Sequence, residues 1–182
     1  MVLKLLAYLI IPTYTILFTK GYNWLTTNFS VIGNLFDKKL AFITWGILVG
    51  LYFYLIFRKL RSLTALGTVC SKLIPAALIL LFCAVTTPYL PEKFPLKSFL
   101  HIIFAFVSTV LLLTFLLIVI WNQYKRFPGR YFRYLAGWAA IIAVSVILLA
   151  AAGIISSALE IFITITTVIL SDRLCTKMRK DT

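Results

Sequence analysis

Six long apolar runs take up most of this 182-residue chain and limit its fold more than any other feature. A helix needs about 17 to 25 apolar residues to cross a bilayer core, because backbone polar groups in lipid must be satisfied within the segment itself. The runs of sufficient length cover residues 2–19, 41–57, 73–90, 99–121, 134–152 and 154–170. We therefore predict an all-α fold, a single transmembrane bundle of six helices over residues 1–182.

The composition agrees with this class. The chain is 62% apolar and 13% charged, whereas a soluble domain is about half apolar and a quarter charged. The longest stretch between two runs, residues 20–40, leaves no room for a separate soluble domain. These features indicate a multi-pass protein of the cell membrane.

The first apolar run and the last two runs each allow a second interpretation. The first run opens with Lys4, as a signal peptide would, but no small-x-small cleavage site follows, so we predict a first helix. Residues 134–170 would be too long for one crossing, and a tight hairpin near Gly153 is the better interpretation.

The basic residues indicate the orientation. With six helices, thirteen of the 18 lysines and arginines fall on one side and five on the other. The five on the minor side are Lys20, Lys38, Lys39, Lys93 and Lys97. Because short cytoplasmic loops collect lysine and arginine, we expect both termini in the cytoplasm.

The net charge of +13 does not indicate nucleic acid, since the bases form short clusters at membrane edges and no continuous stripe. Residues 121–134 mix bases with aromatic side chains, which suits an interface with anionic lipid headgroups. We predict membrane lipids as partners, including anionic lipids on the cytoplasmic side. A plain positive-inside anchor is the simpler alternative for these residues.

Several kinds of cofactor site lack the residues they need. No lysine lies in mid-membrane for a retinal Schiff base, and a single histidine cannot ligate haem from both faces. Cys70, Cys83 and Cys175 are odd in number and have no paired spacing, and no cluster of metal ligands is visible. We expect no cofactor, no metal and no disulfide.

Glu160 is the one acidic residue within the apolar runs, where an ionised carboxylate costs a few kcal/mol. It belongs to a polar stripe at helical spacing that should face the bundle interior. The stripe consists of Ser156, Glu160, Thr164, Thr167 and Ser171. The stripe could be a packing face whose carboxyl group is satisfied by hydroxyls, or a ligand or proton site.

His101 opens the fourth helix on the outer side, after a proline-rich connector that follows Thr86 and Thr87. The first outer loop has interfacial character and carries Ser30 and Asn34, one turn apart if this part is helical. We predict an outward-facing pocket whose ligand-binding residues are Ser30, Asn34, Thr86, Thr87, His101 and Glu160.

These motifs resemble a prokaryotic family of six-helix membrane proteins, the family of domain of unknown function 998. The resemblance rests on Ser30 and Gly33, on Pro88, Pro91 and Pro95 before His101, and on Gly153 before Glu160. It implies six helices and an outward polar pocket, with distant similarity to eukaryotic proteins of lipid-anchor remodelling and autophagy. It implies no particular reaction.

Three functions fit these residues. The preferred one is a pocket that binds a lipid headgroup or a small polar ligand without catalysis. The second is an intramembrane lipid hydrolase, in which Ser30, His101 and Glu160 act as nucleophile, base and orienting group. The third is a structural or partner-binding membrane subunit. A transporter is a weaker fourth reading, since the chain gives little sign of an inverted repeat.

Small residues recur at helical spacing in two of the runs. They are Gly46 and Gly50 in the second run, and Ala136 with Ala140 and Ala139 with Ala143 in the fifth. Such pairs let helix backbones approach closely. We expect packing faces within the chain, with a homodimer seam as the alternative.

Overall fold

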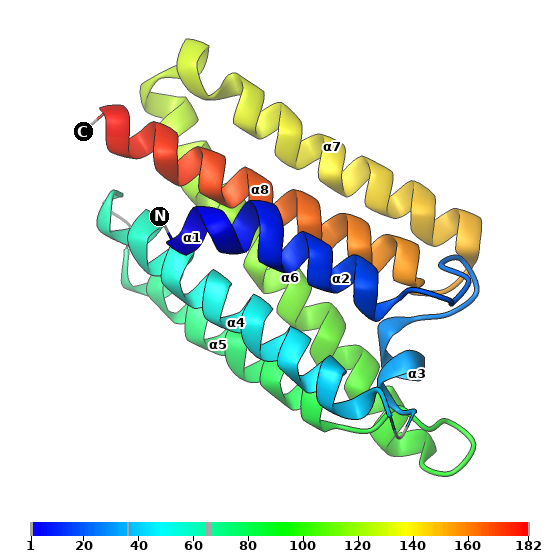
Figure 1. The fold of residues 1–182 in the computed structure, drawn as a ribbon. Helices are drawn as coiled ribbons and strands as arrows, with labels where there is room; N and C mark the ends of the chain where they lie inside the picture. Colours follow the sequence, from blue (N-terminus) through cyan, green and yellow to red (C-terminus); the bar gives the residue numbers. More distant parts are fainter. Residues whose placement is uncertain (1, 36, 65–66, 182) are drawn as a thin grey trace.

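The computed structural model describes residues 2–35, 37–64 and 67–181, and helices make up most of them. In chain order the elements are α1 (Val2–Leu5), the π-helical turn η1 (Leu6–Ile10), α2 (Ile11–Phe18), α3 (Phe29–Gly33), α4 (Lys39–Ser62), α5 (Thr68–Thr86), α6 (Pro95–Arg126), α7 (Pro128–Ala152) and α8 (Ser157–Asp181). The long helices lie side by side as a bundle, with the short α3 at one end (Figure 1). Within the described ranges there is no β-strand.

Three of the described helices are long and apolar enough to cross a membrane: Lys39–Ser62, Pro95–Arg126 and Pro128–Ala152. The segments Val2–Phe18 and Lys72–Thr86 are apolar but shorter. The protein is thus all-helical with the character of a membrane protein.

The described residues form seven helices, where six membrane-crossing helices were expected. Because α1, η1 and α2 run on as one helix, the described residues form six long helices and the additional α3. α3 lies in the first loop, where Asn28 supplies the cap: its Oδ1 accepts a hydrogen bond from Val31 N at 2.7 Å. A five-residue helix lacks the length from which an apolar period could be read.

Most long helices extend beyond the apolar runs that predicted them. The predicted connection at residues 121–134 is reduced to Phe127, because α6 runs to Arg126 and α7 starts at Pro128. Hydropathy marks the part of a helix that lies in lipid, while the helix itself can continue among headgroups. The third run, in contrast, stops at Thr86 and not at residue 90, since Pro88 disfavours a helical conformation at Thr87, which is extended with ψ of 122°.

The first helix contains a π-helical turn directly before Pro12. Proline has no N–H to donate, and its ring clashes with the carbonyl four residues earlier in a regular helix. Ile11 N instead donates to Leu6 O in the wider i to i−5 pattern. The turn keeps the helix continuous past the proline.

The predicted hairpin at Gly153 is present. This residue ends α7 with φ of +68°, a left-handed conformation that glycine adopts without strain. Its N–H donates to Leu149 O at 2.9 Å, which closes the last turn of α7 before the chain returns as α8.

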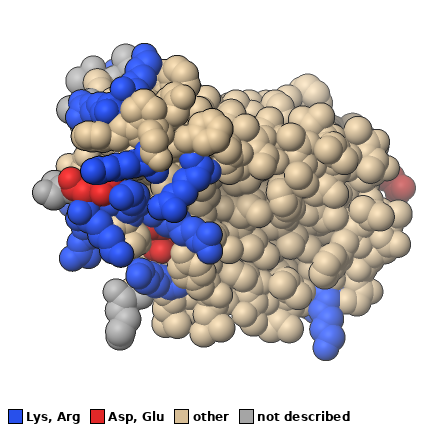
Figure 2. Space-filling model, turned by 90° about the horizontal axis from the view of Figure 1, so that it is seen from above, with Lys and Arg blue, Asp and Glu red and all other residues tan. Residues whose placement is uncertain are grey.

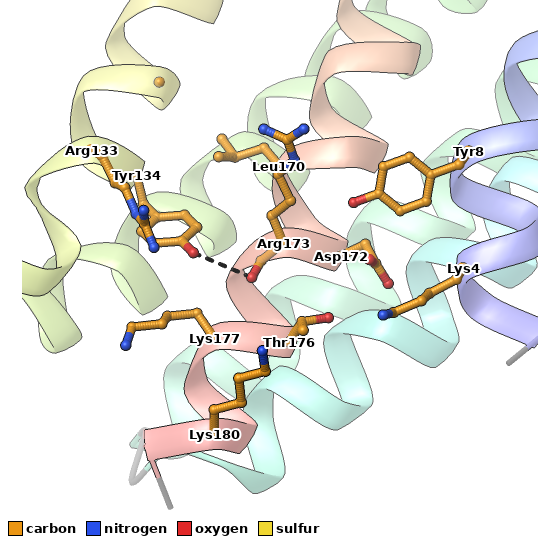
Figure 3. Close-up of a pocket in the computed structure, with 11 residues that line it drawn as sticks. Lys4, Tyr8, Arg133, Tyr134, Leu170, Asp172, Arg173, Thr176, Lys177 and Lys180 are labelled. Carbon is orange, nitrogen blue, oxygen red and sulfur yellow. Dashed lines mark hydrogen bonds between the residues drawn. The ribbon is translucent and has the colours of Figure 1, made fainter.

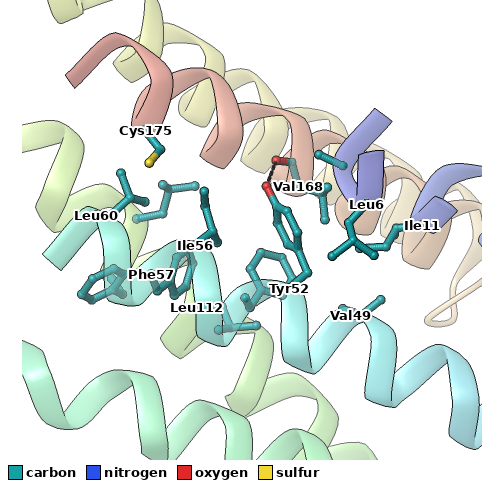
Figure 4. Close-up of a cluster of buried hydrophobic side chains, with 14 of the residues drawn as sticks. Leu6, Ile11, Val49, Tyr52, Ile56, Phe57, Leu60, Leu112, Val168 and Cys175 are labelled. Atoms are coloured by element: carbon teal, nitrogen blue, oxygen red, sulfur yellow. Dashed lines mark hydrogen bonds between the residues drawn. The ribbon is translucent and has the colours of Figure 1, made fainter. Parts of the chain in front are cut away.

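The apolar core surrounds α4. Tyr52 of this helix is fully buried, and its hydroxyl donates to Val168 O of α8 at 2.8 Å (Figure 4). Figure 4 places Leu6 and Ile11 of the first helix on one side of this bond and Phe57 on the other. The core therefore joins the first helix, α4 and α8 into one body.

The two sets of small residues have different surroundings. A Cβ atom at Gly46 would come within 2.7 Å of Val85, so this part of α4 lies closely against α5. Ala136 and Ala140, in contrast, are exposed on α7. The glycine pair thus serves packing within the chain.

The two ends of the bundle differ in charge. Both termini and the connections α4–α5 and α6–α7 lie at one end (Figure 1), and most lysine and arginine side chains in view gather at the same end (Figure 2). The opposite end carries α3, the α5–α6 connection and the α7–α8 turn. The segregation predicted from the sequence is thus present in space.

Candidate functional site

Ser30 and His101 meet at the end of the bundle that carries α3. Ser30 lies in the first turn of α3 and His101 in the second turn of α6, and both are buried. Ser30 Oγ lies 2.5 Å from His101 Nε2. Residues 71 positions apart in the chain thus form one hydrogen-bonded pair.

The backbone fixes which nitrogen of His101 accepts. His101 Nδ1 lies 2.9 Å from the carbonyl oxygen of Thr87, which can only accept a hydrogen bond. In the neutral ring the proton is therefore on Nδ1, and Nε2 accepts from the Ser30 hydroxyl. Thr87 is held in position by the extended conformation that Pro88 imposes.

Asn34 ties α3 to the same connector. Its Nδ2 donates to Ser30 O and to Tyr89 O, both at 2.7 Å. The ring of Tyr89 lies 5.6 Å from that of His101. Asn34 thereby holds the backbone of Ser30 beside the segment that orients the histidine.

Glu160 reaches the same place from α8. Its Oε2 accepts a hydrogen bond from Phe29 N at 2.7 Å, one residue before Ser30. The first amides of α8 also bond to the first loop: Ser157 N donates to Thr27 O at 2.6 Å and Ala158 N to Trp24 O at 2.8 Å. These bonds fix the start of α8 against the loop and set the position of the carboxylate.

The three side chains line one cavity of about 350 Å³. The rest of its wall is mostly apolar and comes from α4, α5, α6, α7 and α8. Along α6 the lining runs from His101 through Thr109 to Leu113, a rise of twelve residue steps or about 18 Å of helix. The cavity is therefore elongated, with Ser30, His101 and Glu160 at the α3 end and the hydroxyl residues Thr109, Ser145 and Thr164 farther along its wall.

The cavity opens sideways between two helices. Four lining side chains are also exposed at the molecular surface, Phe106 and Val110 on α6 and Val146 and Leu149 on α7. These rim residues are all apolar, as expected of an opening that faces acyl chains and not water.

Glu160 has an unusual electrostatic position. Among the described residues, no lysine or arginine lies within ion-pair distance of its carboxylate, and the bond from Phe29 N is its one hydrogen bond. A carboxylate beside apolar walls is costly unless a cation or further donors reach it. The free oxygen is thus suited to an ammonium group or a hydroxyl.

The structure brings together some of the predicted ligand-binding residues and not others. Ser30, His101 and Glu160 line the cavity. Thr87 contributes its carbonyl oxygen, and the Asn34 side chain links two backbone segments, so both act beside the cavity. Thr86 is exposed, and its hydroxyl bonds to Phe82 O and Cys83 O of its own helix, which leaves it outside the site.

The group that bonds to His101 Nδ1 is the carbonyl oxygen of Thr87 and not the carboxylate of Glu160. Both nitrogens of His101 are occupied, by Ser30 and by Thr87 O, and the carboxylate bonds to a backbone amide instead. No sequence signal could have found a backbone carbonyl as a partner. The apolar lining was also missed, because Trp45, Phe106 and Val146 look like any other lipid-facing or core residue until the helices are assembled.

The polar stripe of α8 faces inward as predicted. Ser156, Thr164, Thr167 and Ser171 are all buried, and Thr164 and Glu160 line the cavity. The hydroxyls of Thr167 and Ser171 have no hydrogen-bond partner among the described residues.

The arrangement offers two kinds of chemistry. A hydroxyl bonded to a neutral imidazole is a potential nucleophile with its base, and the three polar groups are also a binding site for a polar headgroup. Within the described ranges, no group of three or more histidine, cysteine, aspartate or glutamate residues could hold a metal ion.

Comparisons with protein-family models, with curated proteins and with solved structures give no match for this chain. The resemblance to the family of domain of unknown function 998 stays a prediction from short motifs.

Proposed function

We propose that the protein is a multi-pass membrane protein of the cell membrane whose lateral cavity binds an amphipathic, lipid-like ligand. The apolar part of the ligand would lie between α6 and α7, and its headgroup would contact Ser30, His101 and Glu160. In this proposal the chain crosses the membrane six times, has both termini in the cytoplasm, and holds the polar groups near the outer leaflet.

One observation carries the proposal: three buried or half-buried polar side chains from three separate segments line one end of an elongated apolar cavity. A purely structural bundle would fill such a space with side chains, since protein interiors are close-packed. The apolar rim supports entry from the bilayer. The unpaired carboxylate favours a headgroup with an ammonium or hydroxyl group over an anionic one.

Photocrosslinking in membranes tests this proposal. The probe is an alkyne-tagged phosphatidylcholine with a diazirine in its acyl chain, and peptide mapping should place the crosslinks on α6 and α7. Loss of the carboxylate charge in Glu160→Gln should lower labelling about tenfold, as a lost charge-assisted contact does.

Thr86→Ala is the matched control, because this hydroxyl lies outside the cavity. It should label like the wild-type protein. Equal labelling of Glu160→Gln, Ser30→Ala, His101→Ala and the control would reject the cavity as a lipid site and would favour a structural or partner-binding role.

The bond between Ser30 and His101 favours a second candidate, acyl transfer from a lipid ester. Ser30 Oγ would attack the ester carbonyl carbon, His101 Nε2 would take the hydroxyl proton, and the same proton would pass to the leaving alcohol. Water would then attack the acyl carbon and give a proton to His101 Nε2. As the bond between this carbon and Ser30 Oγ breaks, His101 would return the proton to Oγ and the carboxylic acid would leave. Thr87 O would stabilise the imidazolium through its bond to Nδ1–H.

A fluorophosphonate probe with a long alkyl chain tests this second candidate. If the serine is activated, the probe should modify Ser30, and His101→Ala should slow labelling at least about 100-fold, the usual contribution of a general base. Ser98 is a buried serine in the first turn of α6 and serves as an internal control. Absence of any adduct on Ser30 would leave the cavity as a binding site without catalysis.

A further inference from the structure

A second cavity lies at the opposite end of the bundle and has a different character. It measures about 490 Å³ and is formed by the first helix, α7 and α8 (Figure 3). It shares no residue with the cavity at Ser30. Its basic lining residues are Lys4, Arg133, Arg173, Lys177 and Lys180.

Most of this positive charge is not neutralised within the protein. Lys177 Nζ donates to Asp181 Oδ1 at 2.8 Å, and this bond holds the pKa of the Asp181 carboxyl below its usual range. No carboxylate in the described part of the chain lies within ion-pair distance of Lys4, Arg133 or Lys180. Asp172 is the one acidic residue in the lining, so the four bases outside the Lys177–Asp181 pair share the cavity with a single acid.

A purely structural role explains only some of the five basic residues that line this cavity. Basic residues in the last turns of α8 interact favourably with the negative end of the helix dipole. Lys4 and Arg133, however, come from the first helix and from the start of α7, and Figure 3 shows them on opposite sides of the residues from α8. Three helices thus bring like charges to one space, where they repel one another weakly and would attract an anion.

The hydrogen-bond donors that line the cavity favour a phosphate group as the anion. The guanidinium groups of Arg133 and Arg173 match the oxygens of a phosphate in a two-pronged geometry, and lysines add point charges. Tyr134 holds the wall together, since its hydroxyl donates to Arg173 O at 3.4 Å and its ring lies 5.2 Å from the Arg133 guanidinium. The hydroxyl of Thr176 adds a neutral donor.

We propose that this cavity binds a phosphate group, carried by an anionic lipid headgroup or by a soluble phosphorylated compound. This proposal does not rest on the proposed lipid site at Ser30, so an experiment can reject one of the two sites and leave the other. It also assigns Asp172 an opposing role, because its carboxylate repels the same anion.

Binding measurements on the purified full-length protein in neutral detergent test the proposal. The probes are dioctanoyl phosphatidylglycerol and inorganic phosphate, each titrated separately. The triple variant Arg133→Gln, Arg173→Gln, Lys180→Gln should weaken binding of both probes at least about tenfold, as the loss of charge-assisted bonds requires. All three side chains are exposed, so the fold should tolerate the changes.

Arg58→Gln with Arg61→Gln is the control, because these exposed bases lie outside the cavity. It should change Kd by less than about twofold, as expected for dispersed surface charge. Equal losses in the triple variant and the control would mean that net charge alone attracts anions, and would overturn the proposal.

Asp172→Asn gives a test that a folding defect cannot imitate. Removal of the repelling carboxylate should tighten binding of both probes about threefold or more. Weaker binding in this variant would contradict the proposed geometry. Phosphatidylglycerol binding tenfold or more tighter than phosphate would assign the site to lipid, and similar affinities would assign it to a soluble phosphate compound.

Discussion

At Gly33 the absence of a side chain allows α3 to lie against α4. A Cβ atom at this position would approach the ring of Phe42 to 2.5 Å. Phe42 is itself fixed, because its ring stacks on Phe18 and on Trp45 with centroids 6.0 Å apart in both cases. The absence of a side chain at Gly33 thus allows the close packing of α3 on α4 in which Ser30 bonds to His101.

We expect Gly33→Ala to displace α3 from α4 and to separate Ser30 from His101. Overpacking of this kind costs about 1–3 kcal/mol of stability. Thermal unfolding in detergent measures the stability, and the rate of fluorophosphonate labelling reports the hydrogen bond. Gly129→Ala is the control, since nothing lies within 4 Å of the added atom. Equal melting temperatures in the two variants would contradict this view of the contact.

The residue types of the site could be predicted from the sequence, but their partners could not. Ser30, His101 and Glu160 stand out because ionisable or hydroxyl groups are rare beside apolar runs. That His101 bonds to Thr87 O depends on where Pro88 ends a helix and on where α6 begins, which are three-dimensional facts. Asn34 was expected to bind ligand because its amide is polar, whereas it joins two backbone segments.

At the scale of the elements, a long apolar run predicts that a helix exists but not where it ends. The period and length of residues 99–121 suffice to predict α6, yet the helix extends to Arg126 because charged residues can continue a helix outside lipid. Local chemistry sets the ends more reliably: Gly153 ends α7 and Pro88 ends α5. The short α3 depends on its Asn28 cap and on contacts with α4, so the hydropathy pattern does not predict this helix.

The π-helical turn at Leu6–Ile10 is likewise set by local chemistry, here by a proline. Pro12 was part of a predicted regular helix, and the helix is continuous because the backbone widens before the proline. The wider turn re-aims the side chains that follow, and Ile11, directly after it, is buried in the core. A local conflict between proline and helix thus contributes to packing of the first helix on α4.

At the scale of the whole molecule, the two cavities lie at opposite ends of the bundle. One is mostly apolar and uncharged apart from Glu160, and the other is strongly basic. The two ends of the bundle should therefore lie in different leaflets of the membrane. Short basic segments stay in the cytoplasm during insertion, so the end with the termini should face inward and the α3 end outward. This orientation would place the phosphate-binding cavity beside the anionic inner leaflet.

Cysteine labelling in intact cells tests the orientation. Lys93→Cys lies in the α5–α6 connection and Arg126→Cys at the end of α6, and both positions are exposed. In a background without Cys70, Cys83 and Cys175, a membrane-impermeant maleimide should modify the cysteine at 93 in intact cells. It should reach the cysteine at 126 only after permeabilisation, because a charged reagent cannot cross the bilayer core. The reverse pattern would place the basic cavity outside the cell and the Ser30–His101 pair inside, and would contradict the charge argument for the whole fold.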